Sequence, residues 1–129
     1  MITSGAFSYI NVLDKAADAS WLREATITNN LANVDTPGFK RKDVDFEGVL
    51  KTELGRSKYV TLDQKVKDLH MNHLNATAYT DSSNFSYRLD GNNVDVDREQ
   101  VELASEQLRY TALTDSITHE ISRFKSVLG

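Results

Sequence analysis

Residues 97–128 read DREQVELASEQLRYTALTDSITHEISRFKSVL and contain neither glycine nor proline. From position 103 onward, a 3-4 spacing aligns eight residues along one side of a helix, and six of these are apolar or aromatic. They are Leu103, Gln107, Tyr110, Thr114, Ile117, Ile121, Phe124 and Leu128. This pattern predicts a long C-terminal helix with a coiled-coil-like seam. Asp97 followed by Gln100 is typical of a capping box and puts the start of the helix there.

The same helix carries a second apolar line, formed by Val101, Ala104, Leu108 and Ala112. At about 100° per residue, this line lies roughly opposite Leu103 on the helix surface. One partner helix covers one face, and each Å² of apolar surface left in water costs roughly 25 cal/mol. Two explanations fit: the middle of the chain folds over the second face, or neighbouring subunits cover it. Head-to-tail contacts between subunits would build a helical stack.

The N-terminal part of the chain predicts a second long helix. Residues 5–33 lack proline, and they lack glycine after Gly5. Their apolar stripe is interrupted at Glu24, and Phe7 and Trp21 flank it. The apolar members of the stripe are Ile10, Leu13, Ala17, Ile27 and Leu31.

A turn is expected to end this helix between residues 32 and 35. Asp35-Thr36-Pro37-Gly38 has turn chemistry, and Pro37 disfavours helical angles at Thr36. Asn33 is expected to take the left-handed conformation of a helix C-terminus.

The middle of the chain gives weaker patterns. Apolar residues over 44–54 predict one short helix, and Tyr59, Val60 and Leu62 predict a short strand. Alternating apolar residues on both sides of Asp90-Gly91-Asn92 predict a small β-hairpin. Their positions are Phe85, Tyr87, Leu89, Val94 and Val96.

The fold class that follows is mainly α, with two long terminal helices packing as an antiparallel coiled-coil-like pair. An irregular middle region joins them. We divide the chain into an N-terminal helix with the turn motif (1–34), a middle region (35–96) and a C-terminal helix (97–129).

Composition excludes several classes of function. The net charge of 129 residues is −4, and the basic run at 40–42 is followed at once by acidic residues, which argues against a nucleic-acid partner. With no cysteine, the chain has neither disulfides nor thiolate ligands. The N-terminus shows no signal-peptide pattern. No apolar run reaches the ~20 residues of a membrane span, so direct membrane insertion is not expected.

No catalytic or metal-binding pattern is present in the sequence. His70 and His73 form an H-x-x-H pair, but neither a zincin glutamate nor further ligands accompany them. The acidic stretch from Asp90 fails as a calcium loop, because Val94 stands at a ligand position and Asp95 at the glycine position. We therefore expect no enzyme activity, no cofactor and no metal.

Residues 29–40 read NNLANVDTPGFK and resemble the signature of the flagellar rod and hook protein family. In that signature, a helix ending in Asn-x-x-Asn precedes a Thr-Pro-Gly-aromatic turn. RKDVDF at 41–46, GNNVDVDRE at 91–99 and QLRY at 107–110 resemble the FlgB branch in particular. Leu31 stands where the family often has isoleucine. The turn motif comprises Asn30, Asn33, Asp35, Thr36, Pro37, Gly38 and Phe39.

This resemblance implies a structural subunit of the proximal rod of the flagellar basal body, which crosses the cell envelope and periplasmic space. Family members leave the cell interior through the flagellar type III export apparatus without losing a signal peptide. The implied partners are other FlgB subunits, the rod protein FlgC, the adaptor FliE, the MS ring and the export gate. The alternative is a non-polymerising helical adaptor or chaperone of flagellar axial proteins.

The resemblance also favours neighbouring subunits as the cover of the second apolar face. Torque would then pass through dense packing of terminal helices. The expected subunit-packing residues are Ile10, Leu13, Ala17, Ile27, Leu31, Val101, Leu103, Ala104, Leu108, Tyr110, Ala112, Ile117, Ile121, Phe124 and Leu128.

Overall fold

The computed structural model describes residues 2–81 and 89–128, with the backbone alone for residues 2–6. The elements are α1 (Ile2–Ala32), β1 (Lys42–Val44), α2 (Phe46–Gly55), α3 (Leu62–Asp68), a 3-10 turn (Met71–Leu74), β2 (Ala78–Thr80) and α4 (Val96–Leu128). None of the described helices combines the length and the apolar character that a membrane span requires.

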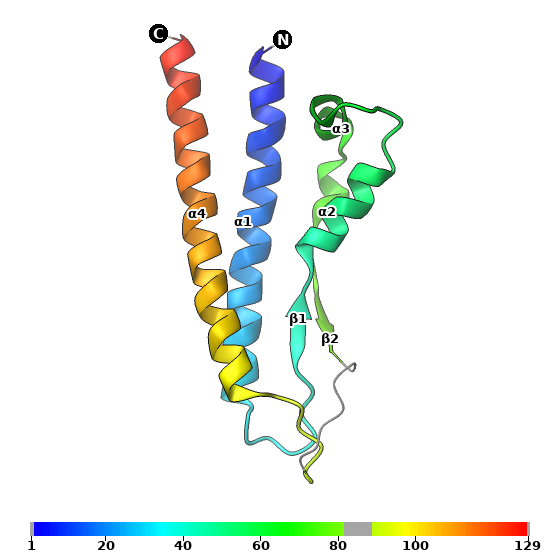
Figure 1. The fold of residues 1–129 in the computed structure, drawn as a ribbon, viewed down its shortest axis with the longest axis vertical. Helices are drawn as coiled ribbons and strands as arrows, with labels where there is room; N and C mark the ends of the chain where they lie inside the picture. Colours follow the sequence, from blue (N-terminus) through cyan, green and yellow to red (C-terminus); the bar gives the residue numbers. More distant parts are fainter. Residues whose placement is uncertain (1, 82–88, 129) are drawn as a thin grey trace.

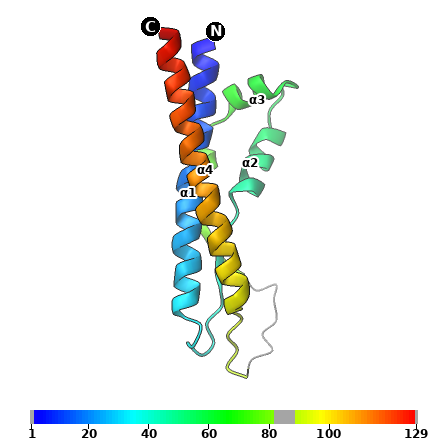
Figure 2. The ribbon, with the colours of Figure 1, turned by 60° about the vertical axis from the view of Figure 1, so that its left-hand side comes forward.

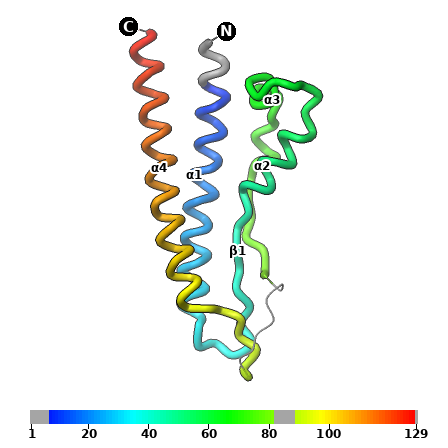
Figure 3. Tube along the Cα trace, viewed as in Figure 1, coloured from blue at the N-terminus to red at the C-terminus, as the bar shows by residue number. Residues whose placement is uncertain are grey.

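The two terminal helices form a long antiparallel pair, with the start of α1 beside the end of α4 (Figures 1 and 2). The middle of the chain runs along α1 on the side away from α4, so α1 lies between α4 and the middle region (Figure 1). The tube in Figure 3 shows α1 turning back into β1 at the end where α4 begins. The predicted fold class, a mainly α chain built on an antiparallel helix pair, is confirmed.

Helix α1 ends where the turn motif predicted, but Asn33 does not take the predicted conformation. α1 ends at Ala32, and the N–H of Asn33 donates to the carbonyls of Asn29 and Asn30 at 3.2 and 3.1 Å. The left-handed conformation predicted for Asn33 is wrong: positive φ occurs only at Gly38 (73°) and Gly91 (77°) among the described residues. Glycine takes such angles without steric cost.

The start of α4 lies two residues earlier than the capping box predicted, with Asp95 in place of Asp97 as the cap. Helix α4 begins at Val96, and Asp95 accepts a hydrogen bond from the N–H of Arg98 at 3.2 Å. Asp97 therefore lies inside the first turn, and Asp95 is the side chain that caps the helix.

The middle region contains one small antiparallel sheet of two strands. Lys42, Asp43 and Val44 of β1 pair with Thr80, Tyr79 and Ala78 of β2. This sheet replaces the hairpin predicted around residue 91. The first predicted strand, at 85–89, falls mostly on residues 82–88, which lie outside the described residues. The second is wrong, since Val94 lies in irregular backbone and Val96 begins α4.

The short helices are partly as predicted. Helix α2 confirms the helix expected over 44–54, and Asp45 caps it by accepting from the N–H of Gly48 at 2.9 Å. The predicted strand at 59–62 is wrong, because Thr61 caps the start of α3 and Leu62 is its first residue.

Little of the chain's apolar surface is buried. Among the described residues, the buried apolar side chains are Ala17, Ala19, Ile27, Val44, Val66, Leu74 and Val94. Large apolar side chains such as Trp21 (61% exposed) and Leu108 (73% exposed) lie in solvent. The accessible surface is 8415 Å², whereas a compact monomer of 14.5 kDa exposes about 6,900 Å². The isolated chain is thus elongated, with a small core.

Candidate functional site

Helix α4 presents two different faces along its length. On the side of α1, Leu103, Tyr110 and Ile117 are half-buried. On the opposite side, Val101 and Leu108 are 67% and 73% exposed, and their neighbours Ala104 and Ala112 are exposed as well. We call these last four residues the outer face of α4.

The other residues expected in subunit packing fall into three groups. Ala17 and Ile27 are buried in the molecule, whereas Ile10, Leu13, Leu31 and Phe124 are half-buried, and Ile121 and Leu128 are exposed. The ring centroids of Phe124 and Phe7 lie 4.8 Å apart. This contact joins the start of α1 to the end of α4, which we call the upper end of the helix pair.

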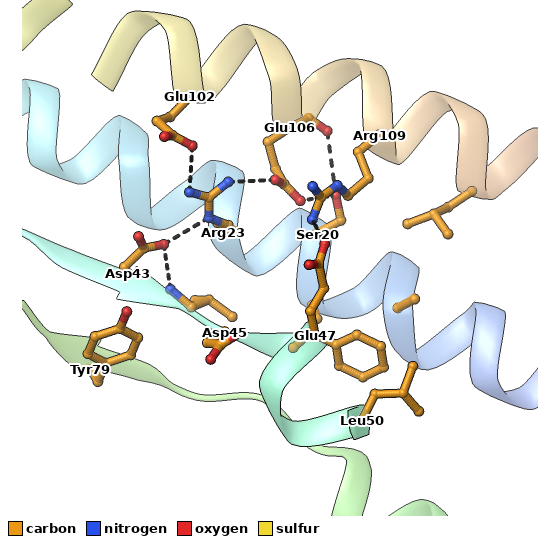
Figure 4. A pocket seen from close by; sticks show the side chains of 15 residues that line it. Ser20, Arg23, Asp43, Asp45, Glu47, Leu50, Tyr79, Glu102, Glu106 and Arg109 are labelled. Carbon is orange, nitrogen blue, oxygen red and sulfur yellow. Dashed lines mark hydrogen bonds and ion pairs between the residues drawn. The ribbon is translucent and has the colours of Figure 1, made fainter. Parts of the chain in front are cut away.

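The most buried side chains of α4 are not apolar. Glu99 and Glu106 are 0% and 2% exposed. Arg23 of α1 donates to Glu106 and Glu102 at 2.7 Å each, and to Asp43 of β1 at 2.8 Å (Figure 4). The hydroxyl of Ser20 donates to the second oxygen of Glu106 at 2.7 Å. One guanidinium therefore links α1, β1 and α4.

A second buried arginine continues this arrangement. Arg41, 1% exposed, donates through Nε to Glu99, through Nη1 to Asp81 at 2.7 Å and through Nη2 to Asp43 at 3.3 Å. Asp43 thus bridges the two arginines. We call Arg23, Arg41 and their carboxylates the arginine cluster; the carboxylates are Asp43, Asp81, Glu99, Glu102 and Glu106.

Electrostatics favour the ionised forms of Arg23, Arg41 and Asp43. Burial lowers the pKa of both arginines, but their hydrogen bonds to carboxylates outweigh that effect and hold each pKa above the usual value. Burial raises the pKa of Asp43, yet the hydrogen bond from Arg23 and the nearby positive charges leave it below the ordinary value. Glu24 is different: burial, and then the charge of Glu106, raise its pKa.

The arginine cluster did not emerge from sequence periodicity, because the predicted seam of α4 passes through Gln107 and contains none of the helix's glutamates. A signal was present nonetheless. Glu99, Glu102 and Glu106 follow the 3-4 spacing of one helix face, next to the seam that begins at Leu103. Three acidic groups on a partner-facing stripe indicate a cationic partner on the facing element.

An open groove of about 470 Å³ lies beside the arginine cluster, between the helix pair and α2 (Figure 4). Ala16, Ala19 and Leu113 line its helix-pair side, opposite Phe46 and Leu50 of α2. Arg109 of α4 reaches across to Glu47 of α2 at 2.7 Å.

The histidines of the H-x-x-H pair lie next to each other in the middle region. Within the described ranges, no three potential ligands come together to hold a metal ion. The rings of His70 and His73 lie 5.3 Å apart, and Nδ1 of His73 lies 3.3 Å from a carboxylate oxygen of Glu53.

The turn motif is tied to the segment before α4 by a second set of polar contacts. The buried amide Nδ2 of Asn92 donates to the carbonyls of Asn33, Val34 and Thr36 at 2.8, 3.0 and 2.9 Å. Its Oδ1 accepts from the N–H of Val94 at 2.8 Å. One side chain from the segment before α4 therefore holds the turn that follows α1.

Neighbouring contacts extend this connection on both sides. The N–H of Gly38 donates to the carbonyl of Asp90 at 2.6 Å, and the N–H of Asn93 donates to the carbonyl of Phe39 at 3.3 Å. Buried Asn30 pairs with the backbone N–H and C=O of Lys42 at 2.9 and 2.8 Å. Residues 29–42 and 90–94 thus form one polar joint at the base of the helix pair.

Comparison with known proteins gives consistent matches. A family model described as "Flagella basal body rod protein" matches residues 10–40. A protein named flagellar basal body rod protein FlgB, from Bacillus subtilis (strain 168), is 36% identical over 119 residues, which are 92% of each chain. The proteins of the same name from Borrelia hermsii and Escherichia coli (strain K12) are 33% and 32% identical over 126 and 113 residues. The Borrelia match covers 92% of this chain and 91% of that protein, and the Escherichia match covers 82% of each.

Proposed function

Since this chain belongs to the family of FlgB flagellar basal body rod proteins, we propose that it assembles helically with related rod proteins in the proximal rod and transmits torque there for motility. The family membership makes the chain a structural component of the flagellar basal body and not an enzyme. The proposal concerns how the subunits hold together.

The observation that carries this proposal is the outer face of α4. Val101 and Leu108 are large apolar side chains in solvent, on the side of α4 away from α1. A continuous apolar face on a soluble chain marks an interaction surface. Because Leu103 and Ile117 already pack on the α1 side, α4 has a second side for neighbouring subunits, and contacts of that kind repeat from copy to copy.

The partners are proposed from the family alone. They are further copies of this chain, the rod protein FlgC, the adaptor FliE, the MS ring and the export gate, in the periplasmic part of the envelope. Export through the flagellar type III apparatus would deliver the chain there. Neither the relatives named above nor the exposed outer face favours a non-polymerising adaptor or chaperone.

The substitution Leu108→Asp tests the proposal. Because Leu108 is 73% exposed, the isolated variant should keep its helix content in circular dichroism. In an assembled rod, the carboxylate would be buried without a partner, which costs several kcal/mol per contact. We expect normal secretion of the variant, no rod assembly and no swimming in soft agar.

The matched control is Gln107→Asp, which adds the same charge at an exposed neighbouring position off the outer face; this strain should swim. Ile117→Asp should also block assembly, but Ile117 is half-buried, so that variant disturbs the helix pair itself. Normal swimming by the Leu108→Asp strain would remove the support for the outer face as a subunit contact.

A further inference from the structure

The segment from the end of α2 to the end of α3, residues 56–68, forms a tip on the middle region. We propose that the tip of one copy of this chain docks in the groove beside the arginine cluster of the next copy. The inference rests on the proposed function for the presence of neighbouring copies. It adds a contact that the outer face of α4 does not provide.

The tip carries apolar side chains that have no use inside one copy. Tyr59, Val60 and Leu62 are 37%, 90% and 57% exposed. Val60 comes directly before Thr61, the cap of α3. An apolar residue at that place often packs on the fourth residue of the helix, which here is Lys65. Val60 therefore has no such apolar contact.

The tip projects from the molecule on a fixed base. In Figures 1 and 2, the connection between α2 and α3 lies at the edge farthest from α4. Val66 of α3 is buried, and the hydroxyl of Tyr9 on α1 donates to Asp63 at 2.5 Å. An apolar group held in place before docking loses less conformational entropy when a partner covers it.

The groove offers apolar walls to such a tip. Leu113 of α4 lines one side, and Phe46 and Leu50 of α2 line the other (Figure 4). All three are half-buried. The volume of about 470 Å³ lies within the roughly 300–1,000 Å³ of clefts that bury a bound group.

The charges of the two surfaces are opposite. Five carboxylates and two arginines line the groove, a net −3. Burial, and then the charge of Asp43, raise the pKa of Tyr79 at the groove wall, as expected beside negative charge. The tip has four lysines and arginines against two aspartates, a net +2, in a chain of net charge −4. Opposite charges steer the two surfaces together and fix their orientation.

The occupant is a second copy because one copy does not fill its own groove. Phe46, the first residue of α2, lines the groove, whereas the tip follows Gly55, the last residue of α2. The ten residues of α2 separate them by about 15 Å, and no tip residue lines the groove. Two complementary surfaces at different places on one chain make a head-to-tail contact, which repeats from copy to copy.

Cross-linking between two single-cysteine variants tests this contact. Because the chain has no cysteine, Val60→Cys puts one thiol on the tip and Leu50→Cys puts one in the groove. In a strain that expresses both variants, a short bismaleimide added to isolated basal bodies should join them into a covalent dimer. Mass spectrometry of the cross-linked peptides identifies the two positions. Strains with only one of the variants should give no dimer.

The matched control combines Leu50→Cys with Asp97→Cys, an exposed position in the first turn of α4 at the base of the helix pair. It should give no dimer. Three results would overturn the inference: no dimer from the tip and groove variants in assembled rods, a dimer from Val60→Cys alone, or Val60→Cys joined only to a different protein.

Two substitutions at Val60 test the charge of the groove. Val60 is 90% exposed, so Val60→Asp and Val60→Lys should both keep the helix content of the isolated chain in circular dichroism. In the acidic groove, an aspartate is repelled, whereas a lysine packs its stem and reaches the carboxylates. We expect at least about tenfold fewer rods with Val60→Asp than with Val60→Lys. Equal numbers of rods in the two strains would overturn the inference.

The cross-link also separates this inference from the proposed function. A strain that swims normally but gives no dimer between tip and groove would overturn the inference and leave the outer face of α4 in place. A Leu108→Asp strain that swims and still forms that dimer would contradict the proposed role of the outer face and support the inference.

Discussion

At the scale of single residues, the polar joint depends on side chains that satisfy backbone groups. Asn92, fully buried, donates through its side-chain amide to the carbonyls of Asn33, Val34 and Thr36 in the turn that follows α1, and its own side-chain carbonyl accepts from the N–H of Val94. One side chain therefore stabilises both the end of α1 and the approach to α4.

The substitution Asn92→Ala should destabilise the chain substantially. It removes the donor that three carbonyls of the turn share and the acceptor of the Val94 N–H, and each hydrogen bond lost in this way typically costs about 0.5–1.5 kcal/mol. We expect a decrease of about 3 kcal/mol in the free energy of unfolding, measured by urea denaturation. Asn75→Ala is the control, because Asn75 is exposed and should change stability by less than about 0.5 kcal/mol. Equal stabilities of the two variants would contradict this role of Asn92.

At the scale of elements, β1 is held to the helix pair by charge more than by apolar contact. Asp43 lies between Arg23 and Arg41, and in β1 only Val44 is buried and apolar. A strand of three residues in a two-stranded sheet is marginal on its own. Its position is thus set by the arginine cluster.

This attachment predicts a dependence of stability on pH. Burial raises the pKa of Asp43, but the bond from Arg23 more than offsets it, so the folded pKa lies below the ordinary 3.8. A carboxyl with a lowered folded pKa adds stability above its unfolded pKa and loses it as pH falls through the folded value. As the pH is lowered below about 4, we expect the urea concentration at the midpoint of unfolding to decrease. The decrease should be less steep in Asp43→Asn, whose midpoint is already lower at pH 7.

Glu24→Gln provides the control for this experiment. Because the pKa of Glu24 is raised by burial and by Glu106, its ionised form opposes folding at neutral pH, and its effect on the profile has the opposite sign. A wild-type midpoint that stays constant from pH 7 to pH 3 would contradict the assignment to Asp43.

The two long helices could be predicted from sequence, and the elements between them only in part. Stretches free of proline and glycine, with apolar residues at helical spacing, define α1 and α4 locally. The pairing of Asp43 with Tyr79 joins two three-residue strands that are far apart in the chain, and no local pattern specifies it. The arginine cluster was equally hidden, because Arg23, Arg41 and Glu99 come together only in the folded chain.

At the scale of the whole molecule, buried side chains are unevenly distributed along the helix pair. Among the described side chains, the buried ones of α1 lie between Ala17 and Asn30, and those of α4 are Glu99 and Glu106. Beyond these, the upper halves of both helices have only half-buried or exposed side chains, with the Phe7–Phe124 contact between them. The pair is therefore fixed at its base and weakly held at its upper end.

Amide hydrogen exchange should reveal this difference. In the isolated chain, we expect amides over 17–32 and 99–110 to exchange at least tenfold more slowly than those over 7–14 and 114–126, because local opening needs less energy where few groups are buried. In assembled rods, the upper halves should become protected as neighbouring subunits cover them. Uniform protection along both helices of the isolated chain would contradict this description.

The exposure of Trp21 on α1 has a practical consequence. It is the chain's single tryptophan and is 61% exposed, so its indole emission comes from one known position in contact with water. Any encounter that dehydrates that part of α1 would move the emission toward the blue. The indole thus reports, in real time and without an attached dye, any association that covers this part of α1.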